Sequence, residues 1–201
     1  MLLHDSHRGI QGRTKKTGSL AFSLCAAIVF LLSLAGCASP RNASTSVTKL
    51  AGRLQCLGPS VSPDEATLTA ETAHAYSLQL TKEYRVVRPA ILHNVLVNLG
   101  LRQRGLCFQW ADDLSAKLQS LNLETLQLHR GVARLETRRE HSSVVLTAPG
   151  QRFVSGIVLD AWRHSGRLYW GDLTADKYPW IEVEVIPEEE SQVRAAGGGS
   201  R

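Results

Sequence analysis

The chain has 201 residues, of which 43% are hydrophobic and 20% charged, and this composition is typical of a folded protein. Its formal charge is +5, but residues 1–36 contain four basic residues and one acidic residue. The remainder carries 19 basic and 17 acidic residues, a balance that gives no reason to expect nucleic acid as a partner. Its length fits one domain, since domains commonly have about 100–200 residues.

The first 36 residues have the order of a secretory signal. Basic residues precede an apolar run from Leu20 to Leu34, and the run ends in Leu34-Ala35-Gly36-Cys37. The run is shorter than the roughly 20 apolar residues that a membrane-spanning helix needs, which disfavours the alternative of a transmembrane anchor. We therefore expect residues 1–36 to be a signal peptide.

The end of this segment resembles the lipobox of bacterial lipoproteins. The resemblance implies that Cys37 is the lipidated N-terminus and that the membrane is a partner through this lipid. Ala38 after the lipidated Cys implies the outer membrane, facing the periplasm, unless the host is Gram-positive. Residues 37–49, rich in Ser, Thr and Asn, are expected to be a flexible tether. The folded domain is expected over residues 50–190, and residues 191–201 as a flexible tail.

Three helices are predicted at the start of the domain. Ser62-Pro63-Asp64-Glu65 combines a Ser cap, Pro at the first helical position and Glu three residues after the cap, so a helix is expected to about Tyr84. A second helix, Pro89–Leu99, is mostly apolar, ends at Gly100 and is expected to be buried. The third begins at or just before Cys107, with apolar residues spaced by three and four: Trp110, Ala111, Leu114, Leu118 and Leu121.

After Leu126 the pattern changes to short runs that are typical of strands. They are Val132–Thr137, Ser143–Leu146, Ile157–Leu159, Leu168–Trp170 and Ile181–Val185. Helices followed by an antiparallel sheet indicate an α+β fold. Asp112 and Asp113 are expected on a solvated helix face. No other cluster of His, Cys and acidic residues has ligand spacing, so we expect neither a metal nor a cofactor.

Cys107, His141 and Asp160 form an ordered trio of chemically useful residues. Cys107 follows the loop Arg104-Gly105-Leu106 and opens a helix, where unpaired amides and the helix dipole favour a thiolate. His141 and Asp160 lie on two predicted strands. If these strands pair across Pro149-Gly150, the imidazole and the carboxylate meet at one end of the hairpin. This order is typical of a Cys nucleophile with a base and a group that orients the base.

Gly105-Leu106-Cys107, His141–Leu146 and Val158–Trp162 together resemble the transglutaminase-like branch of papain-type folds. The likeness is greatest to bacterial transglutaminase-like cysteine peptidases of the periplasm. It implies N-terminal helices on an antiparallel sheet, and a peptidase or amidase in which Cys107 attacks, His141 transfers protons and Asp160 orients His141. A protein or peptide of the cell envelope would be the substrate. Phe108, Gln109 and Trp110, and the pair His141-Ser142, depart from the commoner family residues.

The remaining parts of such a site are less defined by the sequence. An oxyanion hole would use the amide of Cys107 and a side-chain donor, for which Gln103 is the candidate and Asn94 and Asn98 are competitors. Aromatic residues could wall a cleft or belong to the core: Trp162 and Trp170.

Four alternatives remain open. A Cys56–Cys107 disulfide would occupy the nucleophile in an oxidising compartment. His164 in place of Asp160 would give a Cys-His-His site. The chain could be a non-catalytic binding module for an envelope partner, or it could transfer acyl groups to amines.

Overall fold

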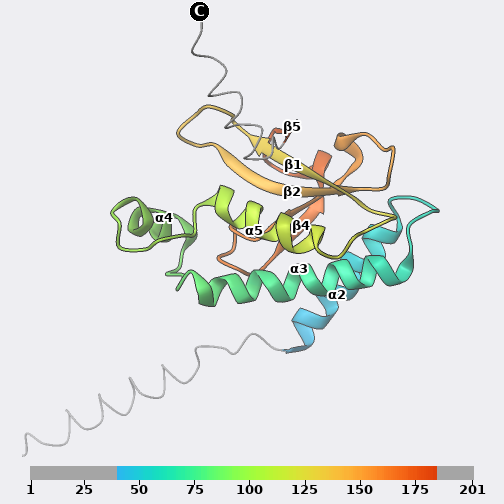
Figure 1. Cartoon of the computed structure of the whole chain (residues 1–201), viewed down its shortest axis with the longest axis horizontal. Coiled ribbons are helices and arrows are strands. Elements are labelled where there is room, and N and C mark those ends of the chain that lie inside the picture. Colours follow the sequence, from blue (N-terminus) through green and yellow to red (C-terminus); the bar gives the residue numbers. More distant parts are fainter. Residues whose placement is uncertain (1–39, 185–201) are drawn as a thin grey trace, which may run out of the picture. The chain divides into compact units, whose positions relative to one another are not determined.

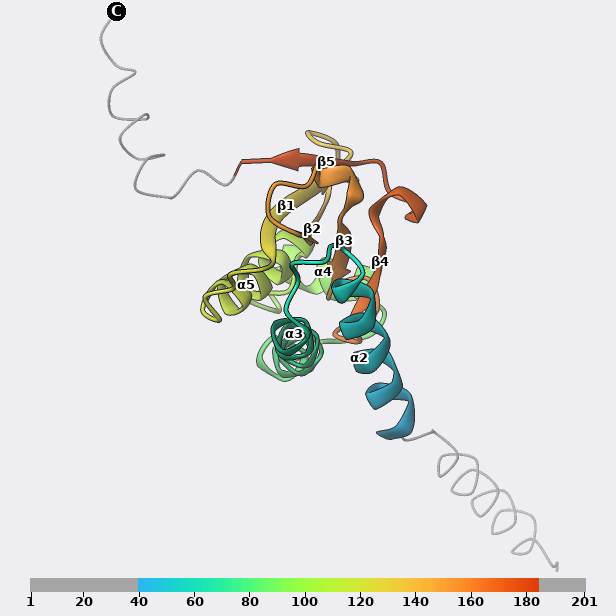
Figure 2. The same ribbon diagram turned by 90° about the vertical axis from the view of Figure 1, so that its right-hand side faces the viewer.

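The computed structural model describes residues 40–184, and it shows an α+β architecture in which helices precede an antiparallel sheet (Figures 1 and 2). The chain divides after Asn42, and the described residues from 43 on belong to one compact unit. The predicted α+β class is confirmed. The helices are α2 Pro40–Gln55, α3 Pro63–Glu83, α4 Ala90–Asn98 and α5 Cys107–Gln119. No helix within the described ranges is long and apolar enough to cross a membrane.

The sheet has five strands in the order β4-β3-β2-β1-β5, with every neighbouring pair antiparallel. The strands are β1 Gln127–Ala133, β2 His141–Thr147, β3 Ile157–Asp160, β4 Tyr169–Asp172 and β5 Trp180–Val183. The predicted pairing of the His141 and Asp160 segments is confirmed, because Val144 lies opposite Leu159 in an antiparallel register.

Strand β1 begins and ends earlier than the pattern Val132–Thr137 predicts. It ends at Ala133, because Arg134 and Glu136 have φ angles of 56° and 62°, which belong to the left-handed region and not to a strand. Residues 134–140 therefore form the connection to β2, and the alternation of apolar and polar residues there does not reflect a sheet position.

Two layers of apolar side chains cover the two faces of the sheet. Helix α5 packs against β2 and α3 packs against α5, so that a core forms between the helices and one face of the sheet. Leu114 and Leu118 of this core are fully buried with Val144. A smaller cluster covers the opposite face and comprises Ala133, Val145, Phe153, Val158, Leu173 and Trp180. Strand β2 is buried along its whole length because both layers meet on it.

Residues 40–49 are helical, so the predicted flexible tether is wrong for this part of the chain. Helix α2 places Leu50 and Leu54 in the main core with no exposed surface, and Val47 packs against them. The folded unit therefore starts well before Leu50. Residues 37–39, with the proposed lipid site Cys37, residues 1–36 and the predicted tail lie outside the described residues, as do residues 185–190 of the predicted domain.

Helix α4 is exposed, which corrects the prediction that it would be buried. Only Ala90 and His93 of this helix are buried, whereas Ile91, Leu92 and Val95 are exposed. The α3 prediction holds in its bounds and its cap: Ser62 accepts a hydrogen bond from the amide of Glu65. The Glu65 carboxylate does not return to Ser62 and instead accepts from the amides of Thr125 and Leu126, thereby tying α3 to the start of β1.

Candidate active site

The nucleophile candidate, Cys107, is the first residue of α5 and lies beside the first residue of β2. Its amide has no intrahelical acceptor, as holds for the first residues of any α-helix. Its Sγ is 3.7 Å from the carbonyl oxygen of Glu140, the residue before His141. Cys107 is partly exposed, so its sulfur can meet a solute. The packing of α5 on β2 thus sets the thiol at the head of the strand that carries the imidazole.

The loop before Cys107 is fixed by His93 and Gln109. His93 Nδ1 accepts from the amide of Val87, so its Nε2 carries the proton that is donated to the carbonyl of Arg104, 3.0 Å away. Gly105 has φ +129°, and a Cβ there would lie 2.2 Å from His93 Nε2, so only glycine fits. Gln109 Oε1 accepts from the amides of Gly105 and Leu106. The polypeptide is therefore held on both sides of the turn that leads into α5.

His141 and Asp160 form a buried pair, with His141 Nε2 2.7 Å from Asp160 Oδ2. Their side chains are 4% and 1% exposed. The other nitrogen, Nδ1, makes no hydrogen bond of ordinary geometry with the described residues. Because Nε2 is occupied by Asp160, Nδ1 is the ring nitrogen that remains to exchange a proton with Cys107.

The environment favours a protonated His141. Burial alone would lower its pKa, but the hydrogen bond with Asp160, the neighbouring Cys107 side chain and the negative charge of Asp160 raise the pKa of His141 from 6.5 to about 9. Burial likewise opposes ionisation of Asp160. The hydrogen bond and charge of His141, and the charge of Arg163, outweigh that effect and lower the pKa of Asp160 below its ordinary value. The pair is thus an imidazolium and a carboxylate at neutral pH.

Arg163 extends the pair into a network that the sequence did not reveal. Its Nε donates to Asp160 Oδ2 at 2.9 Å, its amide donates to Asp160 Oδ1 at 2.9 Å, and its Nη2 donates to Asp176 Oδ2 at 2.8 Å. The side chain of Asp176 is fully buried, and its Oδ1 accepts from the amide of Tyr178. The one available signal was the spacing of three residues between Asp160 and Arg163.

Three aromatic rings enclose the His141 imidazole. The ring centroids of Trp162 and Tyr178 are each 4.8 Å from that of His141, and the centroid of Trp180 is 5.4 Å away. Trp162 is therefore a wall of the site, and its indole N–H donates to Asn94 Oδ1. Trp170 instead packs against the main core. Neither Tyr178 nor Trp180 was predicted to be near His141, because Trp180 begins the edge strand β5 and Tyr178 lies just before it, about forty residues after His141 in the sequence.

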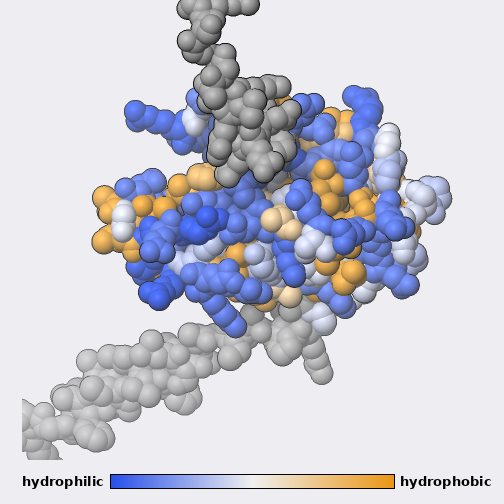
Figure 3. All heavy atoms as spheres, in the orientation of Figure 1, coloured by the Kyte–Doolittle hydropathy of each residue, from blue (hydrophilic) through white to orange (hydrophobic). Residues whose placement is uncertain are grey.

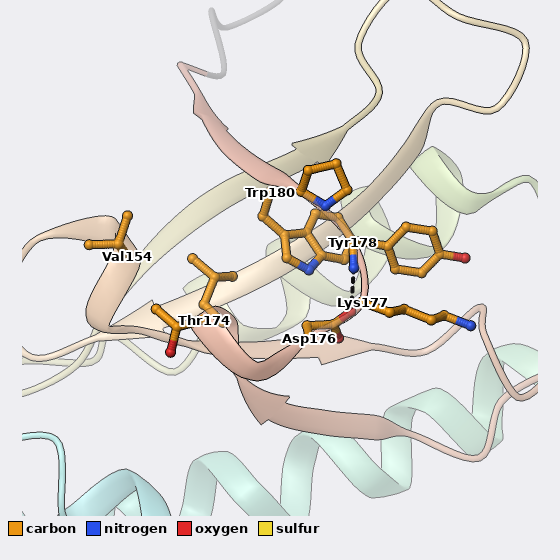
Figure 4. A pocket seen from close by; sticks show the side chains of 8 residues that line it. Val154, Thr174, Asp176, Lys177, Tyr178 and Trp180 are labelled. Carbon is orange, nitrogen blue, oxygen red and sulfur yellow. Dashed lines mark hydrogen bonds between the residues drawn. The ribbon is translucent and has the colours of Figure 1, made fainter.

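A pocket of about 550 Å³ shares Tyr178 and Trp180 with this aromatic wall (Figure 4). It is lined by Val154, Leu173, Thr174, Asp176, Lys177, Tyr178, Pro179 and Trp180. None of the trio lines it, so it adjoins the site through Tyr178 and Trp180 and does not contain the thiol. Its position does not mark the place of the chemistry.

The other candidate residues are placed as follows. Gln103 is exposed and makes no hydrogen bond with the trio within residues 40–184, and the side chain of Asn94 is occupied by Trp162. Cys56 and Cys107 are both free, so the structure contains no disulfide between them. Asp112 pairs with Arg130 and Asp113 with Arg104. Among the described residues no three His, Cys, Asp or Glu side chains are grouped to hold a metal ion.

Comparison with known proteins gives no relative: no protein-family model, no curated protein and no solved structure matches this chain. The arrangement of Cys107, His141 and Asp160 therefore has to be interpreted from its own geometry.

Proposed function

We propose that this chain is a cysteine peptidase or amidase that acts through an acyl-enzyme on Cys107. One observation carries the proposal: a partly exposed thiol at the start of α5 lies against the residue that precedes a buried, hydrogen-bonded His141–Asp160 pair. A thiol, an imidazole and an orienting carboxylate are the groups that nucleophilic acyl transfer needs.

The chemistry requires His141 to carry protons in two directions. In the reactive form the thiol proton already resides on Nδ1 of His141, so that Cys107 is a thiolate beside an imidazolium, and the thiolate attacks the carbonyl carbon of an amide. His141 then protonates the departing amine as the C–N bond breaks, which leaves a thioester on Cys107. Water, deprotonated by His141, attacks the thioester and releases the acid. Asp160 holds Nε2 throughout and stabilises the imidazolium.

Two features support such a sequence of steps. The raised pKa of His141 favours the imidazolium that must accompany a thiolate. The amides at the start of α5, that of Cys107 among them, have no intrahelical acceptors and can donate to a developing oxyanion. The side-chain donor proposed at Gln103 has no support in the geometry, so the backbone amides are the donors on which the proposal rests.

The family and the location belong to the same proposal. The order Cys107, His141, Asp160 on a helix start and two adjacent strands is consistent with the transglutaminase-like branch of papain-type folds. The lipobox-like sequence before Cys37 supports a lipid anchor on the outer membrane, facing the periplasm. A protein or peptide of the cell envelope is the substrate class that this location provides.

A non-catalytic role has one observation in its favour. The His141 side chain is 4% exposed and enclosed by three rings, and the pocket of about 550 Å³ is separate from the thiol. A fold that keeps the trio but closes the approach to it would act as a binding module for an envelope partner. Reactivity of the thiol distinguishes the two.

The test compares two thiols in one molecule. We expect iodoacetamide to label Cys107 before Cys56 at about pH 6, although Cys56 is more exposed and a free thiol has a pKa of about 8.5. His141→Ala should reverse that order, whereas His164→Ala should leave it unchanged. Labelling at each Cys is followed by peptide mass spectrometry under reducing and non-reducing conditions.

A second readout separates an acyl-transfer enzyme from a merely reactive thiol. Incubation with p-nitrophenyl acetate should add one acetyl group to Cys107 with release of p-nitrophenolate, and solvent water or an added amine should remove the acetyl group with regeneration of the thiol. Faster labelling of Cys56 at every pH, or equal labelling of Cys107 with and without His141, would overturn the catalytic proposal in favour of the binding module.

A further inference from the structure

Helix α4 presents an apolar face to solvent and a polar residue to the protein interior. Its buried residues are Ala90 and His93, and at 3.6 residues per turn the outward residues fall within an arc of roughly 100° on the opposite side. Five side chains, between 43% and 67% exposed, form what we call the α4 patch: Ile91, Leu92, Val95, Leu99 and Leu101. Figure 3 shows hydrophobic atoms gathered over α4 at the left-hand end of the molecule.

Exposed apolar side chains that are contiguous in this way mark interaction sites on proteins. The patch is not a loose end of the chain. His93 ties the helix to residues before and after it through the amide of Val87 and the carbonyl of Arg104. The apolar face is therefore held outward by buried hydrogen bonds.

The charged residues of the segment that carries the patch are all of one sign. Between Tyr84 and Ala111 the sequence contains four arginines and no acidic residue. Arg104 is paired with Asp113. The other three, Arg85, Arg88 and Arg102, make no ion pair with any residue in the described part of the chain. Three arginines without an ion pair in the described part of the chain thus flank the apolar residues in the sequence.

We propose that the α4 patch docks on the surface of an anionic lipid bilayer. Apolar side chains enter the boundary between headgroups and acyl chains, while flanking arginines attract anionic headgroups. A second copy of this chain is a poorer occupant, because a two-fold contact would bring the same unpaired arginines together. With nine residues α4 is too short to span a bilayer and would lie along its surface.

This inference does not depend on the catalytic trio, and it adds a second membrane contact to the lipid proposed on Cys37. The α4 patch would orient the domain on the bilayer.

The experiment uses residues 40–201, which lack both the apolar N-terminal run and Cys37. All residues of both core clusters lie between Leu50 and Trp180, so this part contains the complete core. Its formal charge is close to neutral, since residues 37–201 carry 19 basic and 17 acidic residues. Binding is measured by co-sedimentation with vesicles of phosphatidylcholine mixed with phosphatidylglycerol, and with phosphatidylcholine alone.

We expect binding to the mixed vesicles and much weaker binding to phosphatidylcholine. Arg85→Gln with Arg88→Gln should lower the partition coefficient about thirtyfold, since each basic residue near such a surface contributes about 1 kcal/mol. Ile91→Asn with Leu99→Asn should lower it about tenfold or more. Matched controls are Arg138→Gln with Arg139→Gln, and Leu68→Asn with Leu78→Asn on the exposed face of α3, neither of which should change binding.

Circular dichroism and thermal unfolding check that each variant is folded. Absence of co-sedimentation by the folded wild type, or an equal loss in patch and control variants, overturns the proposal. So does a lipid-free dimer, detected by analytical ultracentrifugation, that Ile91→Asn with Leu99→Asn abolishes, because a second copy would then be the occupant. These outcomes are measured without any readout from Cys107 and so test the patch separately from the proposed function.

Discussion

Asp160 connects the residues of the candidate site, because both of its carboxylate oxygens accept hydrogen bonds from them. Oδ2 accepts from His141 and Arg163, and Oδ1 accepts from the amide of Arg163. Together with Asp176 these side chains form a buried group of two acids and two bases. The four charges sum to zero only when His141 is protonated, which agrees with its raised pKa. Charge balance and hydrogen bonding thus favour the same protonation state.

At this scale we predict that Arg163 and Asp176 depend on each other for stability. Arg163→Met leaves the fully buried carboxylate of Asp176 without its partner and should lower the free energy of unfolding by about 3–5 kcal/mol. Asp176→Asn should cost less, because Arg163 keeps its bonds to Asp160. The double variant should cost less than the sum of the single ones, measured by urea denaturation as a double-mutant cycle. Additive losses would contradict the coupling.

The trio could be predicted from the sequence because each member sits at a locally recognisable position. Cys107 follows a glycine at a helix start, and His141 and Asp160 belong to strands joined by a short connection. Arg163, Asp176 and Tyr178 could not be predicted in the same way. They lie in irregular segments after β3 and before β5, where no periodic pattern places a side chain.

At the scale of elements, α2 shows how composition can mislead. The Ser, Thr and Asn content of residues 38–48 favours a linker, yet the helix signal is present in the same stretch. Val47, Leu50, Ala51 and Leu54 are spaced by three, one and three residues, and this face enters the main core. The tertiary contact of that face outweighs the weak helix propensity of the polar residues.

Gly52 provides a test of this helix. It is exposed in α2, and a Cβ there would meet nothing within 4 Å. Gly52→Ala should therefore raise the free energy of unfolding by about 1 kcal/mol, the difference in helix propensity between the two residues. The matched control is Gly150→Ala: its Cβ would also be in open space, but φ is +76°, so this change should destabilise by about 1 kcal/mol. Urea denaturation measures both, and a destabilising Gly52→Ala would contradict a helix at residue 52.

The prediction that residues 89–99 contain a helix is correct, but the prediction that this helix is buried is wrong. Its apolar residues satisfy a helical period, and Gly100 follows its end with φ +72°. Periodicity identifies an apolar face but does not say what covers it. In this fold the helix is held by Ala90 and His93, so the apolar face remains outside.

At the scale of the whole molecule, the sheet was predictable only where its strands are neighbours in sequence. The β2–β3 pair follows from a short connection with Pro149-Gly150. Strand β5 instead joins the free edge of β1, with Glu182 opposite Gly131. No local signal specifies a pairing across fifty residues of sequence, and this pairing is what brings Trp180 beside His141.

The stability of the whole domain should depend on pH through His141. Its pKa is about 9 in the folded state and 6.5 in the reference state. Its contribution is therefore complete below pH 6.5 and is lost as the pH rises toward 9, by about 3 kcal/mol in total. Urea denaturation at several pH values measures this decline. His141→Ala should remove it and Cys107→Ala should reduce it. An unchanged pH dependence in His141→Ala would contradict the assignment.

His93 connects α4 to the backbone just before α5 through hydrogen bonds. Its ring bonds to the backbone on either side of the α4 segment, at Val87 and Arg104, and rests on Gly105. A displacement of α4 that kept these hydrogen bonds would move the backbone two residues before Cys107. By thermodynamic reciprocity, whatever free energy docking of α4 adds to acylation of Cys107, acylation must return to docking. The rate at which Cys107 is acylated would then differ between the membrane-bound and the free domain.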